Sequence, residues 1–175
     1  FVPKKGSIAS IDGGMKTLVK CLVQSLESLD NVTLAIGQES ESPISVSKAY
    51  GVPLESILWT APDPNQVNEH SNLSIFAIGF KKEQVTNIEI GYGTLIPDSN
   101  LPISGILHES DLHNSKRCPE NHRLFRLMVP HNRWDGDEKS VLDCANNLLS
   151  KDPVLFTKIG ERRIPKYKPG YMSKL

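Results

Sequence analysis

Three histidines and a cysteine in one polar stretch are the residues of this chain that most resemble metal ligands. His108, His113, Cys118 and His122 are all permitted zinc ligands, and successive members lie five, five and four positions apart. This spacing matches neither a zinc finger nor a helical zinc motif. Exposed histidines are common in polar loops, so we predict that the chain holds no metal.

Acidic residues cluster in two places, and neither cluster predicts a cation site. The first lies among the histidines, and we interpret it as a solvated loop: Glu109, Asp111 and Glu120. The second resembles the start of a calcium loop but lacks the later glutamate: Asp135, Asp137 and Glu138. Acidic residues are favoured at helix N-termini, and this explains the second cluster better.

Two glycine pairs could bring a ligand close to the backbone. Gly13-Gly14 stands before a helical pattern, and a helix N-terminus with free amides can bind an anion. In the run "GYGTLIP", glycines flank Tyr92 and would let a flat ligand approach. The simpler alternatives are a tight helix entry for the first pair and a strand with a bulge for the second. A methionine in a strand, Met128, is typical of a core, although methionine also suits adaptable apolar pockets.

Two motifs of enzymes are missing from the sequence. There is no Gly-x-Ser-x-Gly, the nucleophile turn of many hydrolases. There is no Gly-x-Gly-x-x-Gly either, so a dinucleotide pyrophosphate has no expected binding loop. The residues alone therefore indicate a globular domain with an apolar pocket.

The elements that would position these residues fall into two groups. In the first part, apolar residues at helical spacing predict a helix from Met15 to Leu29, with Asp12 as its cap. We expect a short strand over 32–36, a weak hairpin over 44–51 and a buried strand at "SILWTAP", 56–62.

The second part has the pattern of a sheet. We expect strands over 73–80, 92–97, 103–109, 123–130 and 154–162, with a helix over 137–149. Residues 123–130 alternate between apolar and other side chains, as in a half-buried antiparallel strand. The predicted class is α+β, with a mixed, mainly antiparallel sheet and a few packing helices.

Composition limits the kinds of partner. The 20 basic and 20 acidic side chains among 175 residues give no net charge, so we expect no nucleic-acid binding. The three cysteines form no Cys-x-x-Cys pair, which indicates a reducing, cytoplasmic location. No apolar run approaches the roughly 18 residues of a membrane span. Peripheral attachment to a membrane and the oligomeric state are left open. Since Phe1 is not methionine, we expect the chain to begin within a longer protein.

Five segments, in order, resemble the second half of the protoporphyrinogen oxidase family of the flavin-containing amine-oxidase superfamily. Each segment by itself matches a degenerate motif, but five such segments in the family's order argue against a chance match. The segments are "IDGGMKTLVKCLVQSL", "GVPLESILWTAPDP", "IGYGTLIPDSNLPISGILHES", "LFRLMVP" and "IPKYKPGY".

The resemblance implies an FAD-dependent oxidoreductase that converts protoporphyrinogen IX to protoporphyrin IX in haem biosynthesis. It places a porphyrinogen-type substrate against four residues: Tyr92, Leu95, Ile106 and Met128. It also places FAD near residues of the first part: Gly13, Gly14, Ser40, Ala61 and Pro62. No catalytic side chain is implied, because the cofactor carries the chemistry.

The resemblance further implies a division into residues 1–64, a remnant of the FAD-binding domain, and residues 65–175, the substrate-binding domain. Because the dinucleotide fingerprint is missing, we expect this chain alone to be inactive and not to bind FAD tightly. Asp12 departs from the arginine common before the glycine pair, which leaves the exact substrate open. The sequence also leaves the electron acceptor open. The alternatives are another enzyme of the superfamily, a desaturase or polyamine oxidase, and a non-catalytic binding module.

Overall fold

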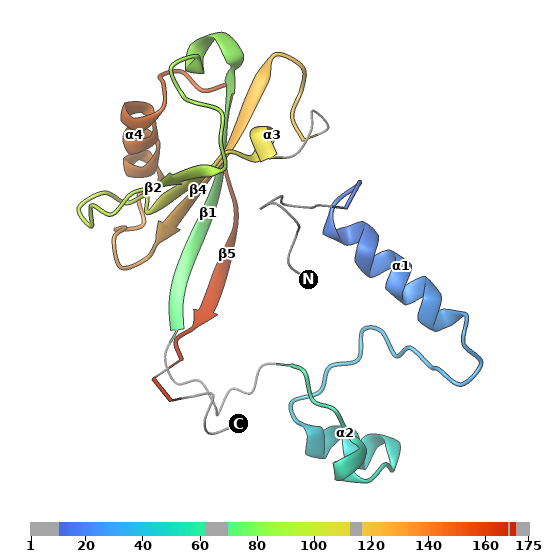
Figure 1. Cartoon of the computed structure of the whole chain (residues 1–175). Coiled ribbons are helices and arrows are strands. Elements are labelled where there is room, and N and C mark those ends of the chain that lie inside the picture. Colours follow the sequence, from blue (N-terminus) through green and yellow to red (C-terminus); the bar gives the residue numbers. More distant parts are fainter. Residues whose placement is uncertain (1–10, 62–69, 113–116, 168, 171–175) are drawn as a thin grey trace. The chain divides into compact units, whose positions relative to one another are not determined.

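The chain divides into two compact units, Phe1–Asp63 and Pro64–Leu175, and each is described here by itself. The computed structural model describes residues 11–61, 70–112, 117–167 and 169–170 (Figure 1). The assignment of the first unit to a flavin domain and of the second to a substrate domain stays a prediction.

The first unit consists of helices joined by irregular segments. Helix α1 spans Met15–Glu27, as the sequence predicts, but its N-cap is Gly14 rather than Asp12. Helix α2 spans Pro43–Tyr50, and a short 3-10 helix, η2, spans Leu54–Ser56. No described residue of this unit is buried, so the apolar stripe of α1 is exposed.

The hairpin expected over 44–51 is wrong, because this segment forms α2. Ser42 and Ser45 exchange side-chain and backbone hydrogen bonds in a capping box, and Pro43 occupies the first helical position. Gly51 ends the helix with a φ of 64°. The strands expected over 32–36 and 56–62 are also absent from their described residues, while Pro62 lies outside them.

The second unit is built on one five-stranded antiparallel sheet, which confirms the predicted α+β class. Its strand order is β2-β3-β4-β1-β5. The strands are β1 (His70–Lys81), β2 (Gly93–Leu95), β3 (Gly105–Leu107), β4 (His122–Pro130) and β5 (Leu155–Pro165). Between them lie η3 (Lys82–Val85), α3 (Glu109–Leu112) and α4 (Glu138–Leu148).

One face of this sheet carries the hydrophobic core. Along β4 every second residue from Arg123 to Val129 is buried, and β1 contributes the facing side chains through pairs such as Phe76 with Leu127. Helix α4 adds its buried residues to the same cluster, and Figure 1 shows it beside the sheet. The core comprises Phe76, Ile78, Phe80, Val85, Ile96, Ile103, Ile106, Phe125, Leu127, Val129, Val141, Cys144, Ala145 and Leu149.

The interpretation of the second acidic cluster as acids at a helix N-terminus is confirmed. The Asp137 carboxylate accepts a hydrogen bond from the Lys139 backbone N–H at 3.0 Å, at the first turn of α4. Asp135 in turn accepts from the Asp137 N–H at 3.0 Å. Among the described residues, no helix is long and apolar enough to span a bilayer.

Candidate functional site

The face of the sheet opposite the core is here called the open face, and much of it is apolar. Residues paired across antiparallel strands point to the same side. Leu95 pairs with Gly105, Gly105 with Met128, and Met128 with Ile75, so these four form one row across four strands. The adjoining positions on this face are Leu73, Ala77, Leu107, Leu124, Arg126 and Leu155.

Two of the four predicted substrate residues meet on this face. Leu95 and Met128 lie on either side of Gly105. A Cβ on Gly105 would lie 3.7 Å from Leu95 Cδ2, so the Leu95 side chain lies against the glycine. Leu95 is 88% exposed on the edge strand β2. Tyr92 lies just before β2 and is also exposed.

Ile106 points the other way. It pairs with Leu127, belongs to the core and is only 3% exposed. One residue along a strand reverses the side-chain direction, so Ile106 cannot share a surface with its neighbours on the open face. The structure therefore brings Leu95 and Met128 together and keeps Ile106 apart from them. The binding role of all four stays a prediction.

The two glycines around Tyr92 have different surroundings. A Cβ on Gly93 would lie 2.4 Å from the carbonyl oxygen of Ile106, on the neighbouring strand. A Cβ on Gly91 would meet nothing within 4 Å. Close strand pairing thus explains Gly93 without a ligand, whereas no contact within the described residues requires a glycine at position 91.

Helix α3 stands at one end of the sheet and carries acids to both faces. On the core side, Asp111 binds the guanidinium of Arg123, with Nη2 donating to Oδ2 at 2.6 Å and Nε to Oδ1 at 3.2 Å. The rest of that guanidinium donates to backbone carbonyls of Val85, Ile88 and Glu89. Arg123 is therefore saturated by the protein.

Burial alone would raise the pKa of Asp111, but the hydrogen bonds from Arg123 and from the Gly91 N–H, with the charge of Arg123, outweigh it. The net effect is a pKa below the ordinary aspartate range. His108 contributes in the same direction, with its Nδ1 3.3 Å from the Asp111 carboxylate. Both ring nitrogens of His108 are buried without an aligned hydrogen bond among the described residues.

On the open side, Glu109 binds the guanidinium of Arg126, with Nη2 2.6 Å from Oε1. Arg117 Nη1 lies 3.9 Å from the other carboxylate oxygen. The interpretation of Glu109 and Asp111 as a solvated loop is thus wrong, because both side chains are buried in ion pairs. Arginines within an otherwise apolar strand pattern were the available signal, since buried charges need partners.

The remaining metal-type residues serve local structure. Cys118 Sγ donates to the backbone oxygen of His122 at 3.0 Å, and His122 Nδ1 donates to that of Glu120 at 2.8 Å. These residues line a pocket of about 130 Å³ beside Arg123. Among the described residues no group of metal-ligating side chains is close enough to hold an ion, and His113 lies outside them.

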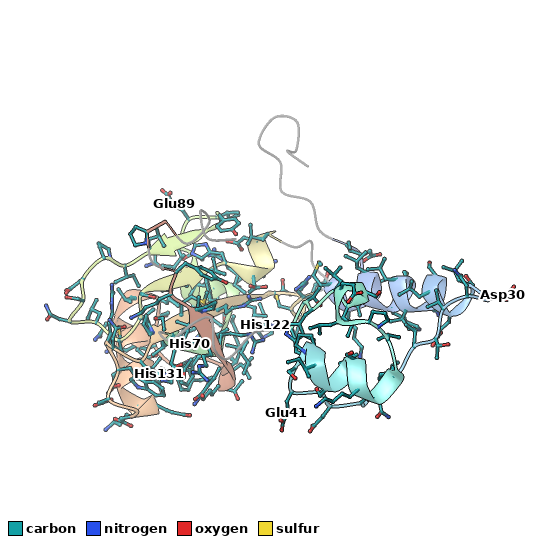
Figure 2. The ribbon with its side chains drawn as sticks, turned by 90° about the horizontal axis from the view of Figure 1, so that it is seen from below. Asp30, Glu41, His70, Glu89, His122 and His131 are labelled. Atoms are coloured by element: carbon teal, nitrogen blue, oxygen red, sulfur yellow. The ribbon has the colours of Figure 1, made fainter. Side chains whose placement is uncertain are left out.

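A polar cluster around His131 lies just after the other end of β4 (Figure 2). Ser74 Oγ and His131 Nε2 are 2.9 Å apart, a distance typical of a hydrolase nucleophile and its base. However, Ser74 is fully buried, so its hydroxyl cannot attack a substrate. Lys158 bonds to Glu161 and lowers the pKa of that carboxyl, with His131 and Ser74 adding to the effect. The cluster joins the segment after β4 to β1 and β5.

The predicted cofactor residues all lie in or beside the first unit. Gly13 and Gly14 both have positive φ, and a Cβ on Gly13 would lie 2.6 Å from Thr17 Oγ1. Helix entry therefore accounts for the pair. The Ser40 hydroxyl bonds to Ser45 at 2.7 Å, within the capping network of α2. Ala61 is exposed after η2, and Pro62 lies outside the described residues.

Comparison with known proteins yields little at the level of sequence. No family model matches the chain, and no curated protein does. Among solved structures, one similar protein is a reduced UDP-galactopyranose mutase, with a TM-score of 0.43 and 19% identity. The match covers 58% of this chain and 23% of the mutase. A match this weak says nothing about what this chain binds or which reaction it serves.

Proposed function

We propose that this chain is the substrate-binding part of an FAD-dependent oxidoreductase and that its open face holds a flat porphyrinogen-type substrate. The observation that carries the proposal is the row Leu95–Gly105–Met128, in which two apolar side chains lie on either side of a glycine on the sheet face opposite the core. The ordered resemblance to the protoporphyrinogen oxidases supplies the reaction, protoporphyrinogen IX to protoporphyrin IX.

A sheet face suits such a substrate for a physical reason. A macrocycle offers a large apolar area and few hydrogen-bonding groups on its faces, so its binding free energy comes mainly from buried area, at about 25 cal/mol per Å². Met128 adds a flexible, polarisable side chain that can adjust to the ring.

FAD, when bound, would supply the oxidation. The first unit fits an anionic cofactor in one respect: among the described residues, no side chain caps the N-terminus of α1, and helix N-termini can bind an anion through backbone amides. Gly13, Gly14 and Ser40, with Ala61 and Pro62, would lie along the cofactor, mainly through backbone groups. The sequence has no pyrophosphate-binding glycine loop, so FAD affinity in this chain alone should be weak.

The direct test is porphyrin binding by the 175-residue chain, followed through the porphyrin absorption band. Leu95→Arg and Met128→Asp should each weaken binding at least tenfold, since each buries a charge under an apolar ring. Leu58→Arg is the matched control, because Leu58 is 90% exposed in the first unit. Equal affinity in all of these proteins would overturn the proposal.

The reaction itself needs the uninterrupted parent protein. There we expect oxygen uptake that depends on protoporphyrinogen IX. Uptake with a polyamine instead, or flavin bleaching by a carotenoid, would assign the chain to another enzyme of the superfamily. A parent that binds porphyrin but contains no flavin would be a non-catalytic binding module.

A further inference from the structure

One arginine, Arg126, lies beside the Leu95–Met128 row of the open face. Arg126 pairs with Leu107 on one side and Ala77 on the other. Along β4 its neighbours on the same face are Leu124 and Met128, each about 7 Å away along the strand. Its side chain is 35% exposed, so the guanidinium is accessible.

The charge around Arg126 is not balanced. Glu109 is its ionic partner among the described residues, and the same carboxylate is also approached by Arg117 at 3.9 Å. Two guanidiniums thus share one carboxylate, which leaves a net positive charge at the border of the apolar face. Arg117 is 36% exposed, so this surplus charge can be reached from outside.

Arg126 differs in this respect from Arg123, which lies three residues earlier on the opposite face. Arg123 is buried, and its donors are taken up by Asp111 and by backbone carbonyls. Glu109 is buried too and holds the head of Arg126 in place. A guanidinium that is held in place and partly exposed is well suited to a second carboxylate, which it can bind through two parallel N–H donors.

We infer that Arg126, assisted by Arg117, is a carboxylate-binding subsite of the open face. The ligand class is a flat apolar molecule with a carboxylate at its edge: the body covers Leu95 and Met128, and the carboxylate reaches Arg126. This inference deepens the proposed function and rests on its use of the open face. It adds a residue that sets orientation, since an apolar row alone would let a flat ring rotate freely.

The test compares two probes with the same body, protoporphyrin IX and its dimethyl ester, on the full chain. The acid should bind at least tenfold more tightly than the ester, as expected for a charge-assisted pair. In Arg126→Gln this preference should fall to near unity, while affinity for the ester stays unchanged. Arg126→Lys keeps the charge but loses the fork, so it should restore only part of the preference. Arg117→Gln should reduce the preference less than Arg126→Gln.

Arg162→Gln is the matched control. Arg162 lies on the same face, opposite Leu73, and the change removes the same charge away from the Leu95–Met128 row. It should keep the full preference for the acid. An unchanged preference in Arg126→Gln, or an equal loss in Arg162→Gln, overturns the subsite. If the unsubstituted chain binds acid and ester equally and Leu95→Arg binds neither, the subsite is overturned but the proposed function stands. No binding of either probe overturns both.

Discussion

The guanidinium of Arg123 binds the carboxylate of Asp111 through two hydrogen bonds, one to each carboxylate oxygen, at 2.6 and 3.2 Å, between β4 and α3. Both side chains are more than nine-tenths buried. The pair fixes α3 to the end of the sheet, and α3 in turn supplies Glu109 to Arg126 on the open face. The position of the proposed carboxylate subsite therefore depends on an ion pair on the opposite side of the sheet.

Breaking this pair should be costly. Asp111→Asn leaves the Arg123 charge buried without its counter-ion, and we expect a loss of about 3 kcal/mol in the free energy of unfolding. Urea denaturation followed by Trp134 fluorescence in a Trp59→Phe background would measure it, because Trp134 packs on Phe76 in the core. Glu83→Gln, which removes an exposed ion pair with Lys81, should change stability by less than about 1 kcal/mol. Similar losses of unfolding free energy in both variants would contradict the assignment of Asp111 as the buried counter-ion of Arg123.

The same pair predicts a response to acid. The pKa of Asp111 is lower in the folded chain than in the unfolded chain. Its stabilisation is therefore complete above the ordinary aspartate pKa of about 3.9 and is lost as pH falls through the folded value. Unfolding free energies measured from pH 6 down to about 2 should show a steeper decline in the unsubstituted chain than in Asp111→Asn. Parallel curves for the two proteins would show that Asp111 does not contribute.

Much of the sheet could be predicted because its pattern is strong. In β4, apolar residues alternate with others over the whole strand, and α4 combines an Asp cap with a clear apolar stripe. The first unit was harder, because the helix of α2 depends on a local capping box rather than on burial. Hydrophobic periodicity does not report side-chain to backbone bonds between Ser42 and Ser45.

The candidate site was only partly predictable for a different reason. Leu95 and Met128 are far apart in sequence, and only strand register places both beside Gly105. The register also places Ile106 in the core. A sequence motif lists neighbouring residues without stating which face of the strand each side chain occupies. Glu109 and Asp111 have the sequence pattern of loop acids, because the arginines that bind them, Arg126 and Arg123, come from β4.

The glycines around Tyr92 give a prediction about structure without any ligand. Gly93→Ala would force a methyl group to within 2.4 Å of the Ile106 carbonyl, so β2 should separate from β3 at a cost of about 2 kcal/mol. Gly91→Ala meets nothing within 4 Å and should change stability by less than about 0.5 kcal/mol. Amide hydrogen exchange at Ile96 and His108, whose N–H groups donate to Ser104 and Tyr92 across the two strands, would show whether the pairing is lost. Equal protection in both variants would contradict the close approach at Gly93.

Ile106 and Leu95 should separate core function from ligand binding. Ile106→Ala empties a fully packed site, and we expect a loss of about 3 kcal/mol in stability. Leu95→Ala removes an exposed side chain and should leave stability within about 0.5 kcal/mol of that of the unsubstituted chain, while porphyrin affinity falls several-fold. Urea denaturation and porphyrin titration of the same two proteins make the comparison. If Ile106→Ala stays folded at the assay temperature and loses affinity more than Leu95→Ala does, the ligand contacts the core side of β3, and the open face is not the binding surface.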